Sequence, residues 1–355
     1  MVKVSVIIPV YNAADYLKES LDCILNQTLN DLEVICVDDG SQDNSLEILN
    51  QIADNDDRVK VMSQKNMGGG AARNNAIPHA TGRYLYFMDA DDKLKENALA
   101  ECYSISSEKD LDFLIFKAVN YAEDTGEIFE TPYYNMEKIR DFAGDDVFSF
   151  EDLGDLIFDI SVTPWCKFYN REFVLKSTAH FLEGSIFHDN QFFWEVLFNA
   201  KRMYFLDEAF YIRRRHSASS TGAGDLRYID IINVVNNIIE LFIKYDQLDN
   251  YKEILYNKKV FWIHTRYLEI RNEFKQDFYI SMKDDFTETS KTDFSKYLDE
   301  KNKFIFECVV SSKTMKEFDL LCENYRLRKE NERLKNQKKL PNFVKYRMKK
   351  ILKSI

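Results

Sequence analysis

The sequence is poor in the residues that usually form metal or disulfide sites. Its six cysteines, at positions 23, 36, 102, 166, 308 and 322, include no Cys-x-x-Cys pair and no zinc-finger spacing. The five histidines are scattered and add no metal-binding pattern. The composition therefore favours reduced thiols in a cytoplasmic protein over a disulfide framework or a zinc domain.

Long apolar runs are also missing. No stretch approaches the roughly 18 apolar residues that a membrane-spanning helix needs. The apolar start of the chain, residues 2–10, carries one lysine and lacks a small-residue cleavage site. We therefore predict a first strand there rather than a signal peptide.

Glycine motifs typical of cofactor binding are absent as well. The run Gly68-Gly69-Gly70 does not have the Gly-x-Gly-x-x-Gly order, and no Lys-Ser/Thr follows it. These absences argue against a nicotinamide-binding domain and against a phosphate-binding P-loop. The three glycines could still let the backbone approach a ligand, with Arg73 one turn into the next helix beside a phosphate; a tight turn is the alternative.

Charge is unevenly distributed along the 355 residues. The net charge is −11, yet residues 335–355 contain eight Lys or Arg and no acid, so the body is more acidic than the whole. An acidic body argues against nucleic acid as the main ligand. In residues 342–355 an apolar helical face lies opposite several lysines, which predicts peripheral attachment to an anionic membrane surface at the inner face of the cell membrane. Packing of this tail against the body or a second subunit is the alternative.

The amino-terminal part of the chain alternates between strand and helix patterns. Apolar strands are predicted at residues 3–10, 32–37, 59–62 and 84–88, with helices at 16–27, 46–52 and 68–77. This alternation implies an α/β fold with a mainly parallel sheet. Polar groups follow three of the strands, at residues 9–12, 38–41 and 89–91, and should meet at the ligand-binding edge of that sheet.

The acidic cluster after the fourth strand is the strongest single feature. Asp89 and Asp91 would project to the same side of an extended chain, with the small residue Ala90 between them. Two oxygen-bearing groups at a strand end predict a site for a divalent cation and a ligand. Taken alone, the motif has a solvated acidic turn as its alternative.

Five segments of the amino-terminal half form an ordered set of motifs. They are residues 4–12, 20–28, 37–43, 66–74 and 88–92. Together they resemble the family 2 glycosyltransferases with the GT-A fold. The resemblance covers about residues 1–221 and implies a GT-A-like nucleotide-binding domain with a mainly parallel central sheet, followed by a mostly helical C-terminal extension.

The resemblance implies roles for several of these residues. Pro9, Tyr11 and Asp39 would hold the base of a nucleotide sugar, the tyrosine by stacking and the carboxylate by accepting a hydrogen bond from uracil. Asp89 would bind the ribose, and Asp91 would bind an Mn²⁺ or Mg²⁺ ion. Such an ion would stabilise the charge that develops on the departing nucleoside diphosphate.

The resemblance also implies a base that takes the proton of the acceptor hydroxyl. The family has the acid of a Glu-Asp pair in this role, after a Trp-x-Lys-x-Tyr/Phe segment. Here Trp165 and Lys167 belong to such a segment, Asp189 keeps the acid, and His188 replaces the glutamate. We expect Asp189 to be the base, with Trp165 and His188 near the acceptor. A helix N-cap role for Asp189 and a helix-entry role for His188 are the alternatives.

Residues 211–221 resemble the basic, Ser/Thr-rich segment that closes over the diphosphate in this family. The candidate contacts are Arg213, Arg215, His216 and Ser219, although some of these cations could form a solvated surface. The Gln-x-x-Arg-Trp motif of processive members is absent. Transfer of a single sugar is therefore predicted rather than polymerisation.

Helical patterns dominate the remainder of the chain. We expect a helical region at residues 222–322, then a coiled-coil helix and the basic tail at residues 323–355. Leu320, Leu327 and Leu334 are seven residues apart, with Asn324 and Asn331 at the intervening core positions. This spacing indicates a weak homo-oligomer, and an exposed helix is the alternative.

Taken together, these features predict an inverting, metal-dependent glycosyltransferase. It would move a single sugar from a nucleotide sugar, a UDP-sugar, to a hydroxyl of a glycan, lipid-linked or polyol-phosphate acceptor in cell-surface polysaccharide synthesis. One alternative is a nucleotidyltransferase, against which the missing lysine-containing glycine loop argues. Another is an inactive protein that only binds a glycan or a partner.

Overall fold

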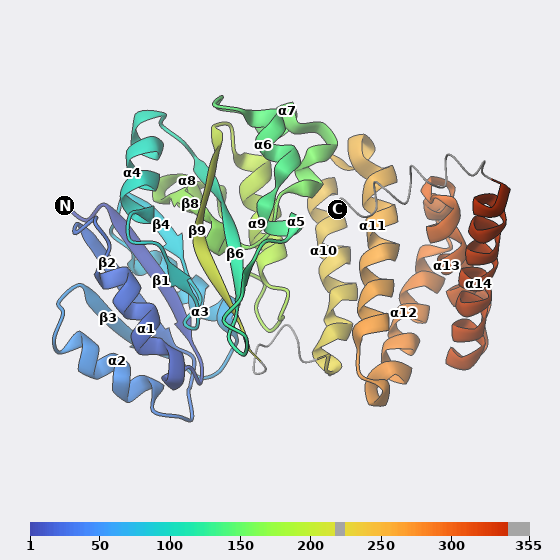
Figure 1. Ribbon diagram of the computed structural model, residues 1–355, viewed down its shortest axis with the longest axis horizontal. Coiled ribbons are helices and arrows are strands. Elements are labelled where there is room, and N and C mark those ends of the chain that lie inside the picture. Colours follow the sequence, from blue (N-terminus) through green and yellow to red (C-terminus); the bar gives the residue numbers. More distant parts are fainter. Residues whose placement is uncertain (217–223, 340–355) are drawn as a thin grey trace. The chain divides into compact units, whose positions relative to one another are not determined.

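The computed structural model describes residues 1–216 and 224–339. These residues form two compact units, Met1–Tyr251 and a second that begins at Lys252. The first unit is of the α/β class and the second is helical (Figure 1). The expected fold class is therefore confirmed. The predicted membrane-binding tail, residues 342–355, lies outside the described residues.

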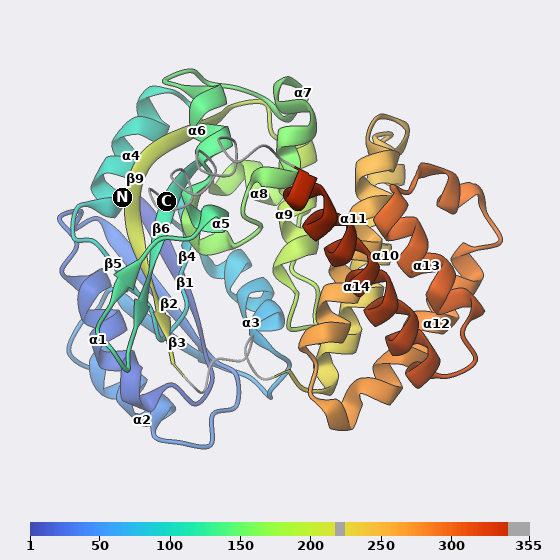
Figure 2. The same ribbon diagram turned by 45° about the vertical axis from the view of Figure 1, so that its right-hand side comes forward.

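The amino-terminal part of the first unit is a parallel sheet with helical connections. Its strands are β1 (Val4–Val10), β2 (Leu32–Asp38), β3 (Val59–Ser63) and β4 (Tyr84–Phe87), in the order β3-β2-β1-β4. The helices are α1 (Ala14–Leu25), α2 (Ser45–Ala53) and α3 (Gly69–Ala76). Helices α1 and α2 pack together on one face and α3 lies on the other, because the direction of the crossover reverses after β3 (Figure 2). The ends of β1, β2 and β4 therefore reach one edge.

The remaining strands make the sheet mixed. Strand β8 (Lys167–Asn170) is antiparallel to β4 and to β6 (Phe113–Ala122), whereas β9 (Met203–Arg215) is parallel to β6. The two-residue strands β5 (Lys93–Leu94) and β7 (Ile128–Phe129) add antiparallel pairs with β9 and β6. The parallel arrangement expected from the sequence thus holds for β1 to β4. The two-residue strands β5 and β7 could not be predicted, because strands this short show no hydrophobic period.

The first unit is completed by further helices, of which the last two pack together through aromatic side chains. They are α4 (Ala98–Glu108), α5 (Pro132–Asn135), α6 (Glu137–Ala143), α7 (Phe150–Leu153), α8 (Arg171–Ser177), α9 (Asp189–Asn199) and α10 (Ile231–Lys244). Helix α9 is buried on most sides, and its Trp194 and Phe198 rings lie 5.0 and 4.9 Å from Phe242 on α10. This aromatic packing fixes the later turns of α9, the helix that begins at Asp189.

The second unit consists of antiparallel helices. They are most of α11 (Leu248–Glu269), then α12 (Lys275–Thr289), α13 (Glu300–Ser311) and α14 (Met315–Lys339). The rings of Phe286 on α12 and Phe306 on α13 pack in a tilted arrangement with their centroids 5.1 Å apart, and the buried Lys259 pairs with Asp285 at 2.7 Å. In the part of the chain that the structure describes, no helix is both long enough and apolar enough to cross a membrane.

Candidate active site

The ends of β1 and β2 are joined by hydrogen bonds through Asn12. Its backbone N–H donates to Ser41 Oγ at 3.0 Å, and its side-chain oxygen accepts from the Gln42 N–H at 2.7 Å. The neighbouring Tyr11 is 48% exposed, so its ring is accessible for stacking, whereas Pro9 is half-buried. The polar edge predicted from the strand ends is therefore present.

Asp39 anchors the loop that leads to α3. Its Oδ1 accepts from Gln64 Nε2 at 2.8 Å and from the Met67 N–H at 2.9 Å, and its Oδ2 accepts from the Gly68 N–H at 2.8 Å. The next residue, Gly40, has φ +74°, and a Cβ there would lie 2.9 Å from the Asn66 nitrogen. The sequence suggested only base binding for Asp39, so this anchoring role is an addition.

The glycine run lets α3 approach another part of the protein. A Cβ on Gly70 would lie 2.7 Å from the Leu182 carbonyl oxygen and 2.9 Å from His188 Cβ. Only glycine fits at this position without a shift of backbone. The close approach at Gly70 is to the segment before α9, so an approach of this backbone to a ligand stays a prediction. This contact brings Arg73 of α3 to Asp189.

Four side chains form what we call the Arg73 cluster: Arg73, Asp89, His188 and Asp189. Arg73 is 3% exposed and makes an ion pair with Asp89. Its Nη1 lies 3.3 Å from His188 Nε2 and 4.0 Å from Asp189 Oδ1. His188 Nδ1 is in turn 2.6 Å from Asp189 Oδ1. One buried guanidinium therefore bridges the aspartate predicted for the donor and the aspartate predicted for the acceptor.

The pKa values of the two aspartates in this cluster are shifted in opposite directions. Desolvation raises the pKa of Asp89 and the nearby charge of Asp91 adds to this, although Arg73 opposes it. For Asp189, desolvation would also raise the pKa, but His188 and Arg73 together outweigh it and the pKa falls below its ordinary value. Asp189 is therefore ionised at neutral pH, as a base that accepts a proton must be.

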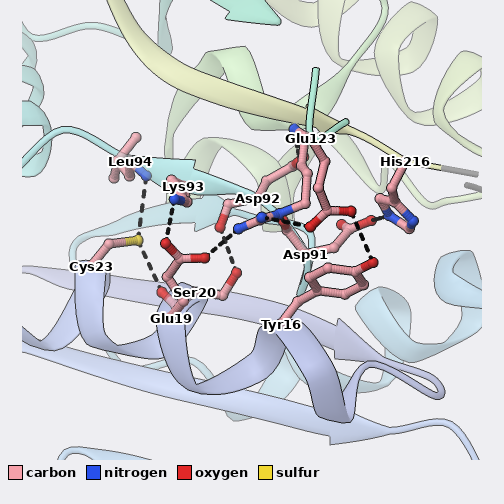
Figure 3. Close-up of polar contacts among 11 residues, drawn as sticks. Tyr16, Glu19, Ser20, Cys23, Asp91, Asp92, Lys93, Leu94, Glu123 and His216 are labelled. Carbon is pink, nitrogen blue, oxygen red and sulfur yellow. Dashed lines mark hydrogen bonds and ion pairs between the residues drawn. The ribbon is translucent and has the colours of Figure 1, made fainter. Parts of the chain in front are cut away.

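Asp91 lies beside His216, which comes from the segment after β9 (Figure 3). His216 Nε2 is 2.8 Å from Asp91 Oδ2, and the Tyr16 ring packs against the imidazole at 4.7 Å between centroids. The side chain of Asp91 is 31% exposed and that of His216 is 9% exposed. The structure thus brings the predicted metal-binding aspartate together with one of the four residues predicted to contact the diphosphate.

A second group of charges, the Arg214 cluster, lies behind Asp91. We define it as Arg214, Glu19, Glu123 and Asp92. Arg214 Nη1 donates to Glu123 Oε1 at 3.0 Å, Nη2 pairs with Glu19, and Nε donates to the Asp91 carbonyl oxygen at 2.8 Å. The cluster therefore fixes the end of β9 onto the loop that carries Asp91.

Asp92 is the buried acid of the Arg214 cluster. Its carboxylate accepts from the Tyr211 hydroxyl at 2.6 Å and from the Arg214 backbone N–H at 2.6 Å. Desolvation and the charges of Asp91 and Asp89 raise the pKa of Asp92 well above its usual range. Asp92 is 3% exposed and so serves the position of β9 rather than solvent chemistry.

The other residues predicted near the diphosphate have different places. Arg213 is half-buried, with its guanidinium 5.8 Å from the centre of the Tyr134 ring, and Arg215 is exposed at the end of β9. Ser219 lies outside the described residues. The buried position of Arg214 was not predicted from the sequence. Side chains alternate between the two faces of a strand, so this position could be predicted only once the extent of β9 is known.

Trp165 occupies a supporting place. Its ring stacks on Tyr211 at 4.3 Å between centroids and is 3% exposed, and its carbonyl oxygen accepts from the Tyr86 hydroxyl at 3.0 Å. So little free surface leaves no face for an acceptor sugar. The nearby Lys167 is fully buried and donates to the Thr163 carbonyl oxygen at 2.8 Å. This hydrogen bond gives Lys167 a structural role in the local fold.

Comparison with known proteins identifies the family. The profile of glycosyl transferase family 2 matches residues 5–163. A glycosyltransferase of Streptococcus pneumoniae, GlyG, is 35% identical over 223 residues, which cover 61% of this chain and 72% of GlyG. The chain belongs to family 2 of the glycosyltransferases. It is therefore an enzyme of this type, and the family argues against the nucleotidyltransferase alternative.

Two further similarities extend this result. A poly(ribitol-phosphate) beta-glucosyltransferase of Bacillus spizizenii is 45% identical over 119 residues, which cover 32% of this chain and 19% of that protein. Residues 1–349 of S. aureus TarS, solved in complex with UDP-GlcNAc, superimpose with a TM-score of 0.70 at 20% identity, covering 92% of both chains. The match to TarS confirms the GT-A-like fold together with the helical region that follows it.

Proposed function

We propose that this glycosyltransferase moves a single sugar from a UDP-sugar to a hydroxyl of a cell-surface polysaccharide acceptor, with inversion at the sugar carbon. The observation that carries the proposal is the Arg73 cluster, in which Asp89 and Asp189 face the same buried guanidinium. The UDP-GlcNAc complex of TarS supports the donor class. The activity named for the Bacillus spizizenii relative supports a polyol-phosphate acceptor, with a glycan or lipid-linked acceptor as the alternatives.

The donor would lie along the polar edge of the sheet. Tyr11 offers an accessible ring for the base, beside Pro9 and Asp39, and Asp89 offers a 37% exposed carboxylate for the ribose. The diphosphate would be contacted by Arg213 and Arg215 at the end of β9, with His216 beside them and Ser219 following in the sequence. In this proposal Arg73 orients Asp89 rather than touching a phosphate.

The residues present fit a hard divalent cation, Mn²⁺ or Mg²⁺. In the described part of the chain, no group of three or more His, Cys, Asp or Glu side chains is arranged to hold a metal ion. Asp91 and the adjacent His216 offer two donors, which suffices when the donor diphosphate supplies further oxygens. When bound, such an ion would neutralise charge on the leaving diphosphate. A mannosyltransferase of the same fold, from Pyrobaculum calidifontis, was solved with GDP-Man and Mn²⁺.

Asp189 would be the base. Its carboxylate takes the proton of the acceptor hydroxyl, the oxygen attacks the sugar carbon from the face opposite the diphosphate, and the nucleoside diphosphate leaves. The lowered pKa of Asp189 keeps it ionised for this step. His188, at 2.6 Å, would hold the carboxylate in position and takes the place expected for a glutamate.

The direct test is nucleoside diphosphate release from a panel of nucleotide sugars, with and without Mn²⁺. We expect release from a UDP-sugar that needs the metal, and an Asp91→Asn variant that loses metal-dependent turnover while unfolding at the same temperature. Asp146→Asn, an exposed aspartate of the same unit, is the matched control. Equal turnover of the Asp91 variant and the native enzyme would contradict the metal assignment, and the anomeric configuration of the product tests inversion.

We also propose that the enzyme acts in the cytoplasm at the inner face of the cell membrane, attached through residues 342–355. The domain limits expected from the sequence, 1–221, 222–322 and 323–355, differ from the two compact units, which divide between Tyr251 and Lys252. Five Lys or Arg in the tail support this attachment, since each basic residue near an anionic leaflet contributes about 1 kcal/mol. Deletion of residues 341–355 should abolish co-sedimentation with anionic vesicles but preserve turnover on a water-soluble acceptor. Failure of the full chain to bind such vesicles at low salt would refute the attachment.

A further inference from the structure

Helix α14 has two faces of different character. One face packs on the other helices of the second unit: Phe318 is buried, and the Tyr325 ring stacks on Phe304 of α13 at 4.2 Å between centroids. Lys329 reaches back to Glu300 at 2.7 Å. The helix is therefore held in place by its own unit along the first half of its length.

The opposite face of α14 carries an exposed leucine stripe. Leu320, Leu327 and Leu334 are 64%, 43% and 47% exposed. Residues seven apart share one face of a helix, and Phe318 and Tyr325 occupy a different heptad position. The stripe therefore points away from α13, and the described residues of its own unit leave it exposed. Three large apolar side chains in a row on an otherwise polar helix are a surface that association would bury.

The residues beside the leucines specify what fits the stripe. If the leucines take the d positions of a heptad, then Asn324 and Asn331 fall at the two a positions between them. A polar Asn at an a position favours two strands in register, because the two amides can hydrogen-bond across the dimer axis. Both asparagines are exposed, as such a seam requires.

The flanking charges are complementary to a second copy of the same helix. Glu323 and Glu330 occupy g positions, while Arg328 and Lys335 occupy the e positions five residues later. In a parallel two-stranded coiled coil each g residue faces the e residue of the next heptad on the partner helix. The pairs would be Glu323 with Arg328 and Glu330 with Lys335, and each would occur twice.

An antiparallel pair is disfavoured by the same residues. There g faces g and e faces e, so acids would oppose acids and bases would oppose bases. In the single chain Glu323 pairs with Arg326 at 2.8 Å, with 50% and 68% of the side chains exposed. An ion pair this exposed contributes little, so Glu323 can exchange it for a partner on another chain.

We propose that the leucine face of α14 is a homodimer interface, a short parallel two-stranded coiled coil between two copies of this chain. The proposal does not depend on the donor, the metal or the base. Because the helix is already formed on its own unit, association has little backbone left to order. The interface has only three leucines from each chain, so we expect a weak dimer, with a dissociation constant on the order of 10 to 100 µM.

Analytical ultracentrifugation of the full chain over a range of concentrations tests the interface. The native chain should approach twice the monomer mass. The triple variant Leu320→Ala, Leu327→Ala, Leu334→Ala should dissociate at least tenfold more easily, with helix content kept because alanine favours helices. Leu268→Ala is the matched control, since Leu268 is 61% exposed on α11 and lies off the seam.

Charge exchange tests the parallel register. Glu323→Lys with Glu330→Lys, and separately Arg328→Glu with Lys335→Glu, should each weaken self-association, and a mixture of the two variants should restore it as a heterodimer. A native chain that stays monomeric on the order of 100 µM, or a triple variant that associates like the native chain, would overturn the interface. If the mixture of the two variants forms no heterodimer, or if the native chain forms particles of three or more copies, the parallel two-stranded arrangement is wrong.

Discussion

The two arginine-centred clusters use the same type of residue for different ends. Arg73 and Arg214 are 3% and 7% exposed, and each brings together carboxylates from distant parts of the chain. The Arg73 cluster ends in two partly exposed aspartates, 37% and 23% exposed, which can meet ligands. In the Arg214 cluster the central acid, Asp92, is buried, and the exposed acids, Glu19 and Glu123, face the arginine from α1 and the end of β6.

This difference shows how a buried cation can serve either chemistry or architecture. Arg73 has two aspartates and an imidazole around it, so removing any one changes the electrostatics of the others. Arg214 also donates to the Asp91 backbone and thereby locks two segments together. We expect variants of the first cluster to affect turnover mainly and variants of the second to affect stability mainly.

The largest effect should come from Asp189→Asn. The amide keeps the shape of the side chain but cannot take a proton, so turnover should fall about a hundredfold or more with nearly unchanged affinity for the nucleotide sugar. Steady-state kinetics at saturating acceptor, together with donor binding by calorimetry, measure the two quantities. Asp146→Asn is again the control. Native turnover in the Asp189 variant would move the base to another residue and remove the functional meaning of the Arg73 cluster.

A paired experiment compares the two arginines directly. Arg73→Met should lower turnover about tenfold to a hundredfold, because Asp89 and Asp189 lose their shared counter-charge. Arg214→Met should cost about 1–3 kcal/mol of unfolding free energy, because its acids lose their charged hydrogen bonds, with a smaller loss of turnover. Urea denaturation gives the loss of unfolding free energy for each variant, and steady-state kinetics give its loss of turnover. If the loss of turnover relative to the loss of stability is the same for both variants, the division between a functional and a structural arginine fails.

The smallest effect is expected for His188→Gln. His188 helps to keep the pKa of Asp189 low, so its removal should let that pKa rise. A base must be deprotonated to act, so the acid limb of the kcat/KM profile should move toward higher pH, with a loss of less than about tenfold at neutral pH. An acid limb that stays in place would mean that Arg73 and Lys167, without His188, keep the pKa of Asp189 low.

Much of the sheet edge could be read from local sequence. Strands β1, β2 and β4 are apolar runs that end in polar residues, and parallel strands joined by helices place those ends together. Asp89, Asp91 and the base candidate Asp189 were found from motifs. The short strands could not be found, because β5 and β7 have two residues each and owe their pairing to β9 and β6.

What only the tertiary structure decided is which charges meet. Arg73 lies 115 residues from His188, and Arg214 lies 195 residues from Glu19, so no local pattern predicts these pairs. The same holds for α14: the heptad spacing of its leucines is visible in the sequence, but their exposure follows from the packing of the opposite face on α13. Periodicity acts over a few residues and fixes elements, whereas ion pairs and free faces depend on how those elements pack.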